Sequence, residues 1–229
     1  MTEPSFTIPL WADLTAVALG GVQGALFASG FRGQRRLDLL GVAVIGTVVG
    51  LGGGLIRDLL LVVRPSMLSN NWYLITVLAA SLLGMLLAAP LHRLSALIVV
   101  LDALVIGLFG AFGTAKALGL GVPVVPAVFV GVFAAVGGGV LRDMIMGLPV
   151  AIMHVGSLYA VAAAAGCVLL VVLHAFGIDL FVSGIAAFGL TAVIRILAVV
   201  FDLSLPEQRM LYRRKVAAET AAVPIVRGQ

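Results

Sequence analysis

Long apolar runs separated by short polar breaks make up the hydropathy pattern of this chain. A helix needs roughly 20 mostly apolar residues to cross a bilayer, and each run is about that long. The breaks hold charged residues or Pro, Asn and His. They delimit seven runs, at residues 11–30, 38–63, 72–90, 95–117, 122–147, 155–176 and 179–201. The pattern predicts an all-α polytopic membrane protein with seven transmembrane helices.

The composition supports a membrane protein. Hydrophobic residues make up 62% of the 229 residues and charged residues 10%, whereas about 25% of a soluble domain is charged. The mean hydropathy is +1.22. These values exclude soluble, disordered and coiled-coil proteins. Cys167 is the only cysteine, so neither a disulfide nor a cysteine-based metal site can form within one chain. We expect a single membrane domain over residues 1–229.

Signatures of enzymes and cofactor sites are absent from the sequence. It contains no Walker-type phosphate-binding motif, no HExxH and no GxSxG, and His92, His154 and His174 lack the spacing of metal ligands. We therefore expect no enzymatic activity, no metal site and no resident cofactor. The net charge of +4 comes from basic residues beside apolar runs, which orient a protein in the membrane and do not indicate a nucleic-acid partner.

Lysine and arginine are distributed unequally between the two sides of the predicted membrane domain. With the N-terminus outside, the outer side holds only Arg64 and Lys116. Cytoplasmic loops carry the excess of basic residues, so the count predicts an N-out, C-in topology with a cytoplasmic tail at 204–229. The inner side holds Arg32, Arg35, Arg36, Arg93, Arg209, Arg213, Arg214, Lys215 and Arg227.

A glycine-rich motif followed by Arg-Asp occurs twice. Gly52–Asp58 reads GGGLIRD in the second run, and Gly137–Asp143 reads GGGVLRD in the fifth run, 85 residues later. Asp13, Gly21 and Gly24 of the first run match Asp102, Gly110 and Gly113 of the fourth at a shift of 89, and Tyr73 matches Tyr159 at a shift of 86.

These matches predict an internal repeat of three helices, 10–93 and 94–177, followed by a seventh helix at 178–203. Three helices per copy is an odd number, so the second copy enters the membrane from the opposite face. The sequence therefore predicts an inverted 3+3 repeat.

Each glycine triplet lies within a predicted membrane helix, where every glycine costs about 1 kcal/mol of helix propensity. Close helix packing is one explanation for such residues. A kink or break that lines a polar path is the other, and two triplets at corresponding places favour it. The candidate residues are Gly52, Gly53, Gly54, Gly137, Gly138 and Gly139.

Charged residues inside the predicted spans are candidate pore residues, because each costs at least about 2.5–3.5 kcal/mol to insert unless it is paired or hydrated. A structural ion pair at a helix end is the alternative. Matching depths in the membrane predict the pairs Asp13–Arg57 and Asp102–Arg142. We expect Arg195 to reach the inner surface near Asp202, and Lys116 carries no specific signal. The remaining candidates are Asp58 and Asp143; Trp72, Tyr73 and Tyr159 are typical of an aromatic belt.

The doubled GGGxxRD motif on the second and fifth of seven predicted helices resembles the prokaryotic branch of the trimeric intracellular cation (TRIC) channel family, also labelled a glycine transporter domain family. The resemblance extends over residues 10–203. It implies a homotrimer in which each protomer conducts K⁺ and other monovalent cations between kinked second and fifth helices. The two glycine triplets would form the kinks, with Arg57, Asp58, Arg142 and Asp143 at or near the pore.

Two functions follow from this resemblance. The first is a passive cation channel in a prokaryotic plasma membrane, with permeant K⁺ or Na⁺, membrane lipids and other copies of the chain as partners. The alternative is a secondary transporter of glycine or another small solute, although polar side chains at mid-membrane depth are sparse. A purely structural membrane protein is a third option. The lipid-binding lysine motif of animal members has no counterpart, since residues 38–51 contain no lysine.

Overall fold

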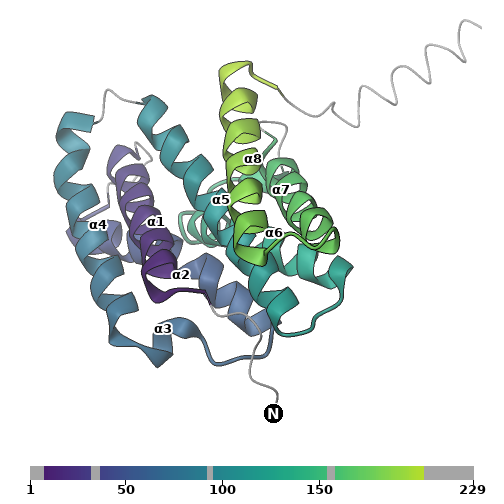
Figure 1. Cartoon of the computed structure of the whole chain (residues 1–229). Helices are drawn as coiled ribbons and strands as arrows, with labels where there is room; N and C mark the ends of the chain where they lie inside the picture. The colour runs from purple at the N-terminus through teal and green to yellow at the C-terminus, as the bar shows by residue number, and fades with distance from the viewer. Residues whose placement is uncertain (1–7, 32–36, 92–94, 154–157, 204–229) are drawn as a thin grey trace, which may run out of the picture.

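The structure is a computed structural model that describes residues 8–31, 37–91, 95–153 and 158–203. All regular elements in these residues are helical, as predicted (Figure 1). The repeat boundary at 93 and 94, the tail at 204–229, His92, His154 and the nine inner basic residues lie outside the described residues. The helices are α1 (Leu10–Gly30), α2 (Leu39–Leu60), α3 (Ser66–Ser69), α4 (Asn71–Leu91), α5 (Ser95–Gly119), α6 (Val124–Ile145), the 3₁₀ helix η1 (Ala151–Met153), α7 (Tyr159–Ala175) and α8 (Leu180–Val200).

Each predicted apolar run corresponds to one long helix. Six of these helices have the length and hydropathy to cross a membrane, whereas α7 is an apolar helix of 17 residues. At 1.5 Å per residue, α7 is about 25 Å long, shorter than a typical hydrocarbon core. The count of seven spans therefore stays a prediction.

Helix starts follow the local chemistry of the sequence. Pro9 and Pro123 directly precede α1 and α6, where a fixed φ and a missing N–H suit the first turn. The side chain of Asp38 caps α2 by accepting a hydrogen bond of 2.7 Å from the Gly41 amide. Asp179 caps α8 by accepting from the Phe181 amide at 2.8 Å. These caps satisfy backbone donors that a helix leaves free.

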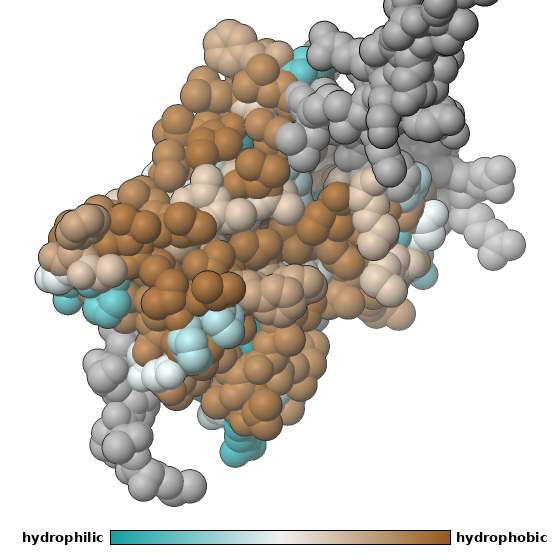
Figure 2. All heavy atoms as spheres, turned by 90° about the vertical axis from the view of Figure 1, so that its right-hand side faces the viewer, coloured by the Kyte–Doolittle hydropathy of each residue, from teal (hydrophilic) through white to brown (hydrophobic). Residues whose placement is uncertain are grey.

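Helices α2 and α6, one from each predicted repeat, pack against each other. Helix α1 packs on α2 and α4, and α5 packs on α6 and α8, while α7 lies against α8 and α6. In Figure 1, α4 forms one side of the bundle and α7 and α8 the other. Figure 2 shows one face, which is apolar over nearly all of its described surface. Exposed residues such as Leu39, Leu86 and Val125 show that the exterior suits lipid.

Both glycine triplets lie inside continuous helices, so the alternative of a break is wrong. The expected bends stay a prediction. The reason for the glycines is the close approach of α2 and α6: a Cβ on Gly52 would lie 3.1 Å from Gly138 Cα, and one on Gly138 would lie 2.6 Å from the Val49 carbonyl oxygen. A Cβ on Gly53 would collide with the Ala134 carbonyl oxygen. The triplets therefore form the α2–α6 crossing.

The ends of α2 and α6 share one hydrogen-bond pattern but differ in one residue. The Val63 amide donates to the Asp58 carbonyl at 3.0 Å, and the Leu148 amide donates to the Asp143 carbonyl at 2.8 Å. The residue before each amide is left-handed: Val62 has φ 54° and Gly147 has φ 64°. This conformation costs a residue with a Cβ roughly 1–2 kcal/mol, which glycine avoids. The 91% exposed Val62 side chain gains little in return from burial.

Val62→Gly should therefore stabilise the protein by about 1 kcal/mol, because it relieves the left-handed valine. Thermal unfolding in detergent should show a midpoint roughly 2–4 °C higher. Gly147→Val at the matching position is the control and should lower the midpoint. An unchanged or lower midpoint for Val62→Gly would show that the valine conformation carries no strain.

Candidate functional site: two buried charge clusters

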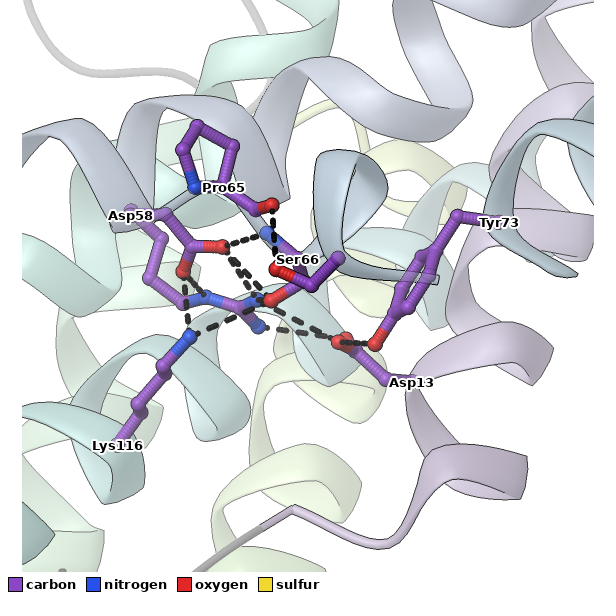
Figure 3. A network of polar contacts seen from close by, with 8 residues as sticks. Asp13, Asp58, Pro65, Ser66, Tyr73 and Lys116 are labelled. Atoms are coloured by element: carbon purple, nitrogen blue, oxygen red, sulfur yellow. Dashed lines mark hydrogen bonds and ion pairs between the residues drawn. The ribbon is translucent and has the colours of Figure 1, made fainter. Parts of the chain in front are cut away.

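The first cluster consists of Asp13, Arg57, Asp58, Ser66, Tyr73 and Lys116, which come from five helices (Figure 3). Arg57 links two carboxylates: its Nη1 lies 3.2 Å from Asp13 Oδ1, and its Nε lies 2.7 Å from Asp58 Oδ1. The Tyr73 hydroxyl donates to Asp13 Oδ2 at 2.8 Å. The Arg57 and Asp58 side chains are only 1% and 0% exposed. The predicted Asp13–Arg57 pair is present.

Asp58 connects this cluster to α5 and α3. Lys116 Nζ lies 2.7 Å from Asp58 Oδ1, and the amide and hydroxyl of Ser66 both donate to Asp58 Oδ2 at 2.7 Å. Two carboxylates thus face two cations, so the cluster is neutral. Removing charges from water is costly unless each finds partners, and this chain of contacts supplies them.

Three residues of the first cluster were not predicted as site residues: Ser66, Tyr73 and Lys116. Tyr73 was expected in an aromatic belt, but it is 8% exposed and bound to Asp13, so that expectation is wrong. Lys116 carried no specific signal, yet it is the second cation on Asp58. One signal could have identified it: Lys116 is the only basic residue of the apolar helix α5.

The second cluster contains the matching residues of the second repeat, but its ion pairs differ. Asp102 Oδ2 accepts from Arg195 Nη2 at 3.0 Å and from Arg195 Nε at 3.2 Å. Asp102 Oδ1 accepts from Gln23 Nε2 at 3.2 Å. Arg142 binds Asp143 Oδ1 through Nε and Nη2 at 2.9 and 2.8 Å. The predicted Asp102–Arg142 pair is therefore wrong, because α8 brings Arg195 to Asp102.

The remaining expectations around this cluster also need correction. Arg195 was expected near Asp202 at the inner surface, but it is 9% exposed and bound to Asp102, whereas Asp202 is exposed. Tyr159 was expected in an aromatic belt and is buried, with the Arg195 guanidinium carbon 5.0 Å from its ring centroid. Trp72, by contrast, is 57% exposed, as an interfacial residue would be.

The space beside the two triplets differs. Next to Gly54 a cavity of about 10 Å³, room for about one water molecule, is lined by residues that include Asp13, Arg57, Asp58 and Tyr73. A Cβ on Gly54 would meet no atom closer than 3.8 Å, whereas a Cβ on Gly139 would lie 2.7 Å from the Tyr159 hydroxyl. Polar space thus exists beside the first triplet, while Tyr159 fills the matching place beside the second.

Other parts of the described structure offer less to an ion. A pocket of about 270 Å³ between α1, α5 and α8 is lined by Leu108, Phe112, Phe188 and other uncharged residues. No group of three or more His, Cys, Asp or Glu side chains that could hold a metal ion occurs among the described residues. The two charge clusters and the glycine crossing are therefore the candidate site.

The fold and these clusters define a helical membrane protein with ionised groups buried between its apolar helices. A family model described as glycine transporter matches residues 10–89 and 99–175. The chain belongs to this family.

Relatives of known sequence are bacterial membrane proteins. A membrane protein of Deinococcus radiodurans is 37% identical over 158 residues, which cover 68% of this chain and 72% of the relative. The inner membrane protein YadS of Escherichia coli K12 is 30% identical over 203 residues, covering 86% of this chain and 94% of YadS.

Solved structures with the same fold are TRIC cation channels. One has a TM-score of 0.77 and 28% identity, covering 88% of this chain and 98% of the channel. The TRIC trimeric intracellular cation channel orthologue from Rhodobacter sphaeroides has a TM-score of 0.73 and 30% identity, covering 84% of this chain and 97% of the orthologue. The structural neighbours are cation channels and the family model is described as a glycine transporter, and neither is a class of enzyme.

Proposed function

We propose that the protein is a passive, K⁺-permeable channel for monovalent cations, with a path in each protomer between α2 and α6. The observation that carries this proposal is the buried, neutral charge cluster beside Gly54, in a fold shared with TRIC cation channels. Charges at this depth are costly to insert, so their presence marks a polar path by default. The carboxylates of Asp13 and Asp58 can offer oxygen atoms to a passing cation.

The path is narrow where it passes the first cluster. The cavity beside Gly54 has room for about one water molecule, and Lys116 places its ammonium group on Asp58. A permeating K⁺ ion would meet the positive charge of Lys116 before it reached the Asp58 carboxylate. Lys116 therefore limits the conductance at the first cluster.

A planar bilayer with asymmetric KCl tests the function. Purified protein should give unitary currents that reverse near the K⁺ equilibrium potential. Lys116→Gln should raise the cation conductance several-fold, because a unit charge about 10 Å from the ion contributes about 1–2 kcal/mol at an effective dielectric constant of 20. Arg64→Gln, which removes a charge outside the cluster, is the matched control. Silent bilayers with all three proteins would contradict the channel.

A secondary transporter of glycine is the second candidate, favoured by the description of the family model. Inverted repeats suit transporters as well as channels. Few polar side chains are free to bind such a solute: the Thr47 hydroxyl, for example, donates to the Ala43 carbonyl of its own helix at 2.8 Å. Counterflow of labelled glycine into proteoliposomes, together with silent bilayers, would favour the transporter.

The assembly and orientation belong to the same proposal. A homotrimer is supported by the likeness to a trimeric channel; native mass spectrometry in mild detergent that shows only monomers or dimers would reject it.

The N-out, C-in topology in a prokaryotic plasma membrane is supported by the count of basic residues and by an inner membrane relative. A cytoplasm-restricted reporter that is inactive at the C-terminus would contradict it.

A further inference from the structure

The two copies of the repeat hold the same charged residues in different arrangements. In the first cluster Arg57 reaches both Asp13 and Asp58. In the second cluster the matching Arg142 pairs with Asp143, and among the described residues no hydrogen bond or ion pair joins it to Asp102, which binds Arg195 instead. The ion pair between the aspartate of the repeat's first helix and the arginine of its second helix is therefore formed in one copy and absent from the other.

Two residues of α1 contact the two members of the missing Asp102–Arg142 pair. Gln23 donates to Asp102 Oδ1, the oxygen atom that Arg195 leaves free. The ring centroid of Phe27 lies 3.8 Å from the guanidinium carbon of Arg142, a distance that gives a favourable cation–π contact. Gln23 and Phe27 are four residues apart, so they project from the same face of α1. Together they hold both members of the missing pair.

The matching positions in the other copy explain the difference. At the shift of 89 residues that aligns Asp13 with Asp102, Phe27 aligns with Lys116. Lys116 binds a carboxylate of the first cluster, whereas Phe27 covers a guanidinium of the second. The tyrosines differ in the same way, because Tyr73 binds Asp13 while the Tyr159 hydroxyl lies against Gly139.

We propose that the second cluster is the gate of the path and is closed here, and that it opens by adopting the arrangement of the first cluster. This inference rests on the proposed path between α2 and α6. In the open state Arg142 leaves the ring of Phe27 and replaces Gln23 on Asp102 Oδ1, while Arg195 keeps Oδ2. Tyr159 turns its hydroxyl from Gly139 toward Asp102, as Tyr73 does to Asp13, and vacates the space beside the triplet.

The exchange conserves the charge balance of the cluster. One amide hydrogen bond and one cation–π contact are lost, and Asp102 gains hydrogen bonds from Arg142 and Tyr159, so neither state leaves a carboxylate unpaired. Phe27 and Gln23 act as positioning residues, since they set the balance between the two states by contacting Arg142 and Asp102.

Double-mutant cycles in thermal unfolding test the inference without requiring conduction. In the unmodified chain, the effects of Asp102→Asn and Arg142→Gln on the unfolding midpoint should add. In a Gln23→Leu/Phe27→Leu background they should become non-additive by roughly 3 °C or more, because the freed side chains can pair. Phe27→Leu alone serves as the background if the double variant does not fold. Additive effects in the modified background, or coupling already present in the unmodified chain, would overturn the proposal.

The same background has a second readout in planar bilayers. Gln23→Leu/Phe27→Leu should raise the open probability several-fold. Phe129→Leu, on an exposed face of α6, is the matched control and should leave it unchanged. An unaltered open probability in the modified background would also overturn the gate. Silence of every variant would contradict the proposed channel, and the unfolding cycle would still decide the pairing.

Discussion

Gly53→Ala and Gly138→Ala are expected to lower stability strongly, and leucine at either position should prevent folding. A Cβ on Gly138 would lie 2.6 Å from the Val49 carbonyl oxygen, and one on Gly53 would collide with the Ala134 carbonyl oxygen. Backbone atoms cannot rotate away, so the helices must separate. Overpacking of this kind costs about 1–3 kcal/mol for one methyl group. The unfolding midpoint of either alanine variant should fall by roughly 4–8 °C.

Gly54→Ala is the matched control within the same triplet. A Cβ there would meet no atom closer than 3.8 Å, and alanine gains up to about 1 kcal/mol of helix propensity. This variant should fold at least as well as the unmodified protein, and it should conduct less, because the methyl group enters the cavity beside Gly54. Equal stability of Gly53→Ala and Gly54→Ala would contradict the α2–α6 crossing as the reason for the glycines.

Arg57→Ala is expected to have the largest effect of any single charge substitution. It removes the only cation bound to Asp13 among the described residues and one of two bound to Asp58. Breaking a buried ion pair by removing one partner costs about 3–5 kcal/mol. The yield of folded protein and the unfolding midpoint in detergent should both fall sharply.

Neutralising the partner should relieve part of this loss. The double variant Asp13→Asn/Arg57→Ala should be more stable than the sum of the single effects predicts, with a coupling above about 0.5 kcal/mol. Arg64→Ala, at an exposed arginine, should stay within about 0.5 kcal/mol of the unmodified protein. A coupling below 0.5 kcal/mol would show that Asp13 and Arg57 do not depend on each other.

Hydropathy was sufficient to find the long helices, and the repeated motif was sufficient to find the two buried Arg-Asp pairs. Both signals are local in the sequence: an apolar run sets the length of a helix, and Arg-Asp after a glycine triplet sets a charge near its end. Matching depth in the membrane was enough to predict the Asp13–Arg57 pair. It was enough because α1 and α2 are adjacent in the chain and pack together.

Pairings that depend on the lateral arrangement of helices could not be predicted in this way. Depth in the membrane predicted that Arg142 would pair with Asp102. The position of α8 determines instead that Arg195 binds Asp102. The role of the glycine triplets could not be decided from the sequence for a related reason. Three glycines in a membrane helix are compatible with a break or with close packing, and only the position of α6 against α2 distinguishes the two.

The Asp102–Arg195 pair has a consequence for how the protein is made. Asp13 is followed by its partner after 44 residues, so α1 and α2 can neutralise each other as soon as α2 has been made. Asp102 precedes Arg195 by 93 residues, which at about 5–20 residues per second is a delay of roughly 5–20 s. During synthesis Asp102 therefore lacks the cation that it binds in the folded protein until α8 is inserted. Helix α8 thus completes the membrane insertion of the repeat that precedes it.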